Sequence, residues 1–96
     1  GKAALLAANY RTEERMAAFL LDISSRYARR GFSAHRFNLT MTRTEIANYL
    51  RMAPETASRV LRRLSDEEVI AVKQREIILL QPERLALMAA TDDASE

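Results

Sequence analysis

The segment at residues 53–64, APETASRVLRRL, contains the side chains best suited to recognise another molecule. Its apolar residues recur at the i, i+3, i+4, i+7 spacing of a helix packed on a core; they are Ala57, Val60, Leu61 and Leu64. The opposite face of such a helix carries a carboxylate, a hydroxyl and two guanidinium groups, from Glu55, Ser58, Arg59 and Arg62.

The chemistry of this polar face matches the base edges of duplex DNA. Arg59 can donate two hydrogen bonds to guanine, Glu55 can accept one from a cytosine amino group, and Ser58 can contact several base edges. Glu55 could instead be a first-turn acid that stabilises the helix dipole by about 0.3 to 1 kcal/mol. Because Ser58 and Arg59 share its face, we favour base reading.

Positive charge is concentrated around the same segment. Between Arg26 and Arg63 the chain has nine arginines and two glutamates, a net +7 within a total of +2. Such a field favours a polyanion, and the excess of arginine over lysine favours bidentate binding of phosphates or base edges. Ordinary solvated arginines on helix faces are the alternative interpretation of the charge alone.

Caps and periodicity predict the elements before this segment. Residues 2–10 are expected to be helical, with a bend near residues 9–11, and a second helix is expected from Thr12 to about Arg30, stopped by Gly31. A loop with one short strand at residues 38–40 should follow.

The next two helices are predicted from their first residues. Thr42 and Glu45 match a capping box, which opens a short helix ending near Leu50. Pro54 is tolerated as the first residue of the next helix, at residues 54–67, because its missing N–H has no intrahelical partner there.

The rest of the chain reads as a hairpin and a final helix. Residues 69–72 and 76–80 form two short β-rich runs joined by three polar residues, and Pro82 can begin a helix that includes Met88. We therefore expect one domain, mainly α with a small β-hairpin, in the order of a helix-turn-helix followed by a wing. In that geometry the helix from Pro54 enters the major groove.

At this point the chain resembles the C-terminal DNA-binding domain of the Crp/Fnr transcription regulators. The resemblance covers about residues 11–89 and is carried by ERMAAFLLDISSRYARRGFS and LTMTRTEIANYLRMAPETASRVLRRLSDEEVIAVKQREIIL. The branch named for the fumarate-nitrate reduction regulator typically has Glu-x-x-Ser-Arg on its recognition helix, and residues 54–59 read PETASR. That branch is the closer match.

The resemblance implies a role for each polar residue of this region. Glu55, Ser58 and Arg59 would read a TTGAT-like half-site of an inverted repeat in double-stranded DNA. Phosphate contacts would come from Thr42, Arg43, Thr44, Thr56, Arg62 and Lys73.

The resemblance also implies a longer, homodimeric protein. Residues 1–10 would be the end of the dimerisation helix and the hinge, residues 11–90 the winged-helix domain, and residues 91–96 a disordered tail. The loop at residues 31–37 corresponds to a surface that can contact RNA polymerase. No cofactor is expected within these residues; an upstream sensor domain could bind an iron–sulfur cluster, haem, a cyclic nucleotide or nothing.

Three positions depart from the family pattern. Arg51 occupies the turn between the helices, where many relatives have glycine; a left-handed residue there costs about 1 kcal/mol, so we expect a turn of different shape. Ala53 replaces the usual hydroxyl at the N-cap, a loss of about 1 kcal/mol. Gln74 replaces a glycine at the wing tip, which leaves the turn type open.

The leading alternative function is a winged-helix module that binds another protein rather than specific DNA. An enzyme is not expected, because the chain shows no paired carboxylates, metal-ligand spacing, glycine-rich phosphate loop or nucleophile–base set. The chain has no cysteine, which excludes disulfides and zinc–thiolate sites within it. Such a cysteine-free chain is usually cytosolic, and we expect a cytoplasmic protein. No apolar run approaches the roughly 18 residues of a membrane span, so we also expect it to be soluble.

Overall fold

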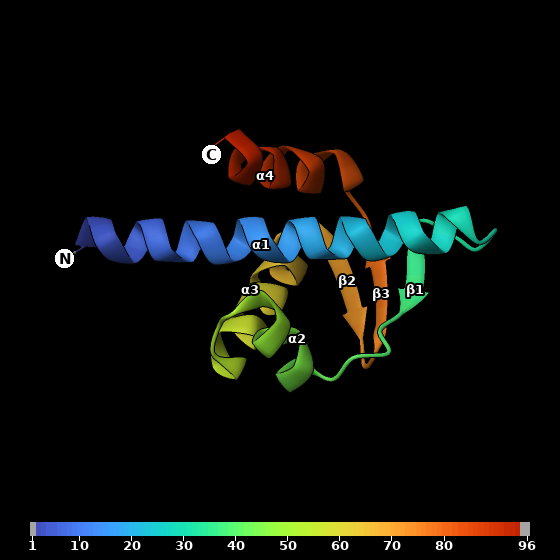
Figure 1. Ribbon diagram of the computed structural model, residues 1–96, viewed down its shortest axis with the longest axis horizontal. Helices are drawn as coiled ribbons and strands as arrows, with labels where there is room; N and C mark the ends of the chain where they lie inside the picture. Colours follow the sequence, from blue (N-terminus) through green and yellow to red (C-terminus); the bar gives the residue numbers. More distant parts are fainter. Residues whose placement is uncertain (1, 95–96) are drawn as a thin grey trace.

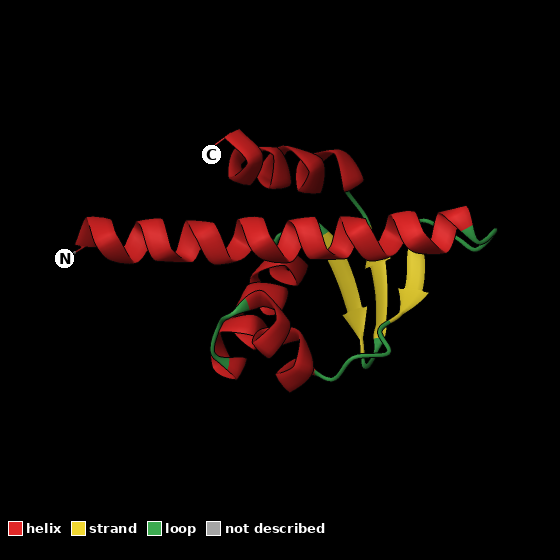
Figure 2. Ribbon diagram, viewed as in Figure 1, coloured by secondary structure: helices red, strands yellow, loops and turns green. Residues whose placement is uncertain are grey.

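The computed structural model describes residues 2–94, with side chains described for residues 11–90. In chain order the elements are α1 (Lys2–Arg29), β1 (Arg36–Asn38), α2 (Arg43–Leu50), α3 (Pro54–Asp66), β2 (Ile70–Lys73), β3 (Glu76–Leu79) and α4 (Pro82–Ala94). Figure 1 shows α1 as a long rod with α4 along one side and with α2, α3 and the strands on the other. The expected mainly helical, winged helix-turn-helix fold is confirmed (Figure 2).

Helix α1 is continuous from Lys2 to Arg29. The bend expected near residues 9–11 is therefore absent, and the two predicted helices are one. Gly31, in the left-handed region at φ 87°, ends the helix as predicted, and the N–H of Phe32 reaches back to the carbonyl of Tyr27 at 2.9 Å. The buried face of α1 includes Met16, Ala17 and Leu20.

The three strands form one antiparallel sheet in the order β1-β3-β2. The predicted hairpin is confirmed, with Lys73 paired to Glu76 across the turn. The first strand lies at Arg36–Asn38 instead of residues 38–40, and it pairs with β3 so that Phe37 faces Ile77. This register places Phe37 in the core, at 4% exposure, which explains why the strand begins earlier than predicted.

Helices α2 and α3 are packed by the apolar residues that the sequence indicated. Their buried side chains are Ile46, Ala47, Leu50, Ala57, Val60, Leu61 and Leu64. The capping box of α2 is present: the Thr42 N–H donates to Glu45 Oε1 at 2.8 Å, and the Glu45 N–H donates to Thr42 Oγ1 at 3.1 Å. The α3 N-cap Ala53 makes no side-chain hydrogen bond, as its residue type requires.

The turn between α2 and α3 does not have the different shape that we expected from the arginine at position 51. Arg51 lies in the left-handed region at φ 58° and ψ 51°, the conformation that glycine would adopt most easily. The N–H groups of Arg51 and Met52 bond to the carbonyls of Asn48 and Ala47, so the last turn of α2 is capped. The turn keeps the shape that suits glycine and carries the strain in Arg51.

The end of the chain is more helical than predicted. Helix α4 continues to Ala94 and so includes residues 91–94 of the tail that we expected to be disordered. Residues 95–96 of that tail lie outside the described residues. Leu85 of α4 is fully buried, which anchors the helix on the core.

Candidate nucleic-acid interface

The outer face of α3 presents the predicted base-reading set. Glu55, Ser58 and Arg59 are exposed on the first turns of the helix, whereas the opposite face lies in the core. Neither Glu55 nor Ser58 forms a side-chain hydrogen bond or ion pair with another described residue. Figure 1 shows α2, α3 and the β2–β3 turn on the side of α1 away from α4. These elements can therefore approach one ligand surface together.

Arg59 is the one member of the set with an internal contact. Its Nη2 donates to Thr56 Oγ1 at 3.2 Å, one turn earlier on the exposed side of α3. Because a guanidinium group has five N–H donors, the contact leaves donors for a base edge. Thr56 is half-buried, so its hydroxyl steadies Arg59 near the start of the helix.

The predicted phosphate-contacting residues border this face. Thr42, Thr44, Arg62 and Lys73 are exposed, and Arg43 and Thr56 are half-buried. The Thr42 hydroxyl is already engaged with Glu45: its oxygen accepts the Glu45 N–H at 3.1 Å, and the side chain also hydrogen-bonds the Glu45 carboxylate. The residues predicted to contact phosphates did not include Arg75, which is exposed at the wing turn close to Lys73. Its positive charge at the tip of the predicted hairpin could have indicated it.

The carboxylate of Glu45 is stabilised in its charged form. The hydrogen bond from the Thr42 backbone, then that from the Thr42 side chain and the charge of Arg75, hold the pKa of Glu45 below its ordinary value of 4.5. Glu45 therefore fixes the first turn of α2 and lies within the electrostatic reach of the wing. The capping box and the wing turn are neighbours on the same surface.

Arg43 connects α2 to the wing. Its Nη2 donates to the carbonyl oxygen of Gln74 at 3.0 Å. Partial burial lowers the pKa of Arg43 from its ordinary value, although guanidinium groups stay protonated in proteins. The side chain lines a hollow with Ser58, Arg62 and Val72, between α3 and the wing.

Two arginines of the basic block form ion pairs with other parts of the fold instead. Arg26 pairs with Asp22 at 3.0 Å within α1, and Arg63 near the end of α3 pairs with Glu13 of α1 at 2.6 Å. The positive charge available at the recognition face is therefore smaller than the sequence count suggested. The pair between Arg63 and Glu13 also ties α3 to the long helix.

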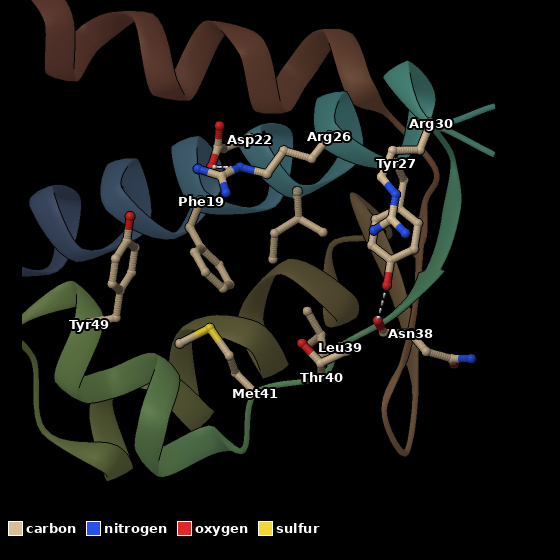
Figure 3. Close-up of a pocket in the computed structure, with 11 residues that line it drawn as sticks. Phe19, Asp22, Arg26, Tyr27, Arg30, Asn38, Leu39, Thr40, Met41 and Tyr49 are labelled. Atoms are coloured by element: carbon tan, nitrogen blue, oxygen red, sulfur yellow. Dashed lines mark hydrogen bonds and ion pairs between the residues drawn. The ribbon is translucent and has the colours of Figure 1, made fainter. Parts of the chain in front are cut away.

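A separate apolar groove lies between α1, the segment after β1 and α2 (Figure 3). Its walls include Phe19, Tyr27, Leu39, Met41 and Tyr49. Figure 3 shows these rings and apolar side chains around a shared hollow, with the Tyr27 hydroxyl donating to the Asn38 carbonyl at 3.1 Å. The groove is lined by none of the predicted DNA-contacting residues.

The loop at residues 31–37 adjoins this groove. Phe32 is 58% exposed and packs edge-on against Tyr27, with the Arg30 guanidinium 5.7 Å from its ring centre. Phe37 is buried and stacks on Tyr27. Of the two phenylalanines in this loop, only Phe37 is in the core.

The described part of the chain has neither a candidate metal site nor a helix that could span a membrane. Residues 2–94 contain no group of three or more histidine, cysteine, aspartate or glutamate residues that could hold a metal ion. Within the same residues, every helix is too short or too polar to cross a bilayer.

The fold defines the class of protein: a winged helix-turn-helix domain. A family model described as the Crp-like helix-turn-helix domain matches residues 14–88. The structure of FixK2 from Bradyrhizobium japonicum is similar, with a TM-score of 0.72 and 32% identity, over 80% of this chain and 37% of that chain.

Two curated relatives are regulators by name, in agreement with the family model. The chain is 45% identical over 85 residues to the transcriptional activator protein Anr of Pseudomonas protegens, which covers 88% of this chain and 35% of that protein. It is 42% identical over 92 residues to the fumarate and nitrate reduction regulatory protein of Vibrio cholerae, covering 96% and 37%. The chain thus spans about a third of the length of these relatives.

The chain belongs to the Crp-like helix-turn-helix family, as a DNA-binding domain of the Crp/Fnr type. The predicted resemblance to the fumarate-nitrate branch is confirmed by the names and identities of these relatives. One relative is named a transcriptional activator and the other a regulatory protein of fumarate and nitrate reduction. Neither is named as an enzyme, in agreement with the expectation from the sequence.

Proposed function

We propose that this chain reads a TTGAT-like half-site of an inverted repeat in the major groove, as the DNA-binding part of a homodimeric regulator. One observation carries the proposal: Glu55, Ser58 and Arg59 are exposed together on the first turns of a helix whose other face is anchored in the core. Arg59 would donate to guanine, Glu55 would accept from cytosine, and Ser58 would contact a neighbouring base edge.

Phosphates on either side of the half-site would bind the residues that border this face. The proposed contacts are Thr42, Arg43, Thr44, Thr56, Arg62 and Lys73, to which we add Arg75. Their positions on α2, α3 and the wing would fix the orientation of α3 without reading sequence themselves. Arg59 and Arg62 lie on one face of the same helix, which provides a matched pair for testing the two roles.

The test is a gel-shift titration with the chain dimerised through a leucine zipper fused before residue 2. Arg59→Ala should weaken binding to a TTGAT inverted repeat by about 1 to 3 kcal/mol and relax discrimination at one base pair. Arg62→Ala should weaken specific and scrambled sites nearly alike and lower the salt slope by about one unit.

Two outcomes would reject the proposal. If Arg59→Ala weakens specific and scrambled sites equally, the base-reading assignment is wrong. If the unsubstituted dimer binds neither site, or binds both equally, the alternative of a protein-binding winged helix is favoured; the apolar groove of Figure 3 supplies a surface for it.

The remaining parts of the regulator follow from the family. We propose that residues 1–10 are the end of the dimerisation helix, joined without a break to the rest of α1, and that a sensor domain precedes them. The ligand of that domain stays open among an iron–sulfur cluster, haem, a cyclic nucleotide and none. A chromosomal target in bacteria implies a cytoplasmic protein.

RNA polymerase is the second proposed partner, through the loop at residues 31–37. The support is local: Phe32 is exposed beside Arg30, and the apolar groove continues the surface along α1. This surface is made by α1 and the segments around β1, with Tyr49 of α2 in its wall, and it contains none of the proposed DNA contacts. DNA and a polymerase subunit could therefore be bound together.

A further inference from the structure

The turn at the wing tip has a conformation that its sequence does not favour. Lys73 and Glu76 are paired, so the connection consists of Gln74 and Arg75 alone. Gln74 has φ 58°, and Arg75 is not among the described residues with positive φ. That pattern is typical of a type II′ hairpin turn, which usually has glycine at the first central position. Contacts outside the turn must help to hold it.

Both carbonyl groups of this turn are held from outside the hairpin. On one side, Arg43 Nη2 donates to the Gln74 carbonyl at 3.0 Å. On the other side, the N–H of Leu39, just after β1, donates to the Arg75 carbonyl at 2.8 Å. The wing tip is thus fixed between the first residue of α2 and the end of β1.

Arg43 is well placed to couple the position of the wing turn to that of α2. It is the first residue of that helix and directly follows Thr42, whose capping box with Glu45 fixes the first turn. Its side chain is half-buried in the hollow between α3 and the wing. One Nη donor is used on Gln74, and the other donors of the guanidinium group remain for an anion.

We propose that Arg43 is a positioning residue for the wing: its hydrogen bond to Gln74 braces the β2–β3 turn against α2 and so sets where Lys73 and Arg75 meet the DNA backbone. The inference rests on the proposed DNA binding for its consequence, but the brace itself exists without DNA. Arg43 therefore acts on affinity partly through the two wing cations, beyond any phosphate contact of its own.

The brace is tested first without DNA, by hydrogen exchange of backbone amides in the full chain. Arg43→Met, which keeps the apolar stem but removes the donors, should speed exchange at residues 73–76 by roughly two- to tenfold, the effect of losing one hydrogen bond. The matched control is Arg62→Met, since Arg62 lines the same hollow and makes no hydrogen bond or ion pair with another described residue. It should leave those amides unchanged, and neither variant should alter exchange in α1.

Arg43→Gln keeps a hydrogen-bond donor on a shorter side chain and should give intermediate exchange rates at residues 73–76. It also controls for the possibility that methionine destabilises the whole domain. If the wing amides exchange at the unsubstituted rate in both Arg43 variants, the brace does not exist. If exchange rises equally in α1 and the wing, Arg43 supports the whole fold and the proposal is also wrong.

The consequence for binding is tested by a double-mutant cycle on the zipper-dimerised chain. Lys73→Ala should weaken DNA binding at least twofold less in the Arg43→Met background than alone, because the unbraced wing no longer presents Lys73. Independent losses that simply add would overturn the positioning role. A chain that binds no DNA would reject the proposed function, while the exchange experiment would still decide the brace.

Discussion

Three residues other than glycine lie in the left-handed region within the described part of the chain. Arg51, Glu68 and Gln74 have φ values of 58°, 59° and 58°. In each case the backbone keeps a conformation that glycine adopts without a Cβ clash. The fold therefore tolerates local strain at the ends of α2 and α3 and at the wing tip, because hydrogen bonds to neighbouring segments hold those turns.

Arg51→Gly should stabilise the protein. Removing the Cβ from a left-handed residue should raise the free energy of unfolding by up to about 1 kcal/mol, after the larger flexibility of glycine in the unfolded chain is included. Urea denaturation measures the change. Arg51→Ala is the control, since it removes the same charge and keeps the Cβ; equal stability of the two variants would contradict the strain.

Glu45 should make stability depend on pH. Its pKa is lowered in the folded state, so its contribution is present above the unfolded value and is lost as the pH falls through the folded value. Between about pH 6 and pH 3, the unsubstituted protein should lose more stability than Glu45→Gln, which retains the capping oxygen without titrating. Parallel pH profiles of the thermal unfolding midpoint would rule this out.

At the level of elements, the sequence predicted what depends on near neighbours along the chain. The capping box joins Thr42 to Glu45 three positions later, and the buried face of α3 repeats within two turns, so both could be read directly. The shared exposed position of Glu55, Ser58 and Arg59 on α3 could be predicted for the same reason, because one helix face holds all three; their role in base reading stays a prediction.

The features that sequence reasoning missed depend on distant partners. Strand β1 has three residues, too few to show a period, and its register is set by pairing Phe37 with Ile77 forty positions later. The hydrogen bond from Arg43 to Gln74 spans 31 positions. Nothing local to Arg43 distinguishes a brace from a phosphate contact, so only the folded arrangement reveals it.

For the whole molecule, affinity should depend on joining two domains. On an inverted repeat, the zipper-dimerised chain should bind about 10²- to 10⁴-fold more tightly than the chain alone, because the second half-site is engaged at a high effective concentration. A fluorescence-anisotropy titration measures both.

A duplex with five extra base pairs between the half-sites is the control for this prediction. Five base pairs are about half a helical turn, so the second half-site would face away and the gain should disappear. A gain that survives the insertion would show that the domains bind without fixed geometry, contrary to the proposed dimer.

The unbroken course of α1 has a mechanical consequence for such a dimer. Whatever fixes the rotation of its first turns also fixes the direction in which α3 faces, because Lys2–Arg29 is one helix. A helix rotates by about 100° per residue, so a single residue inserted near residue 10 would swing the domain by more than a quarter of a circle. Seven inserted residues would return it to within about 20° of its original aim. The number of residues in α1 thus determines the direction in which the domain faces relative to the start of the helix.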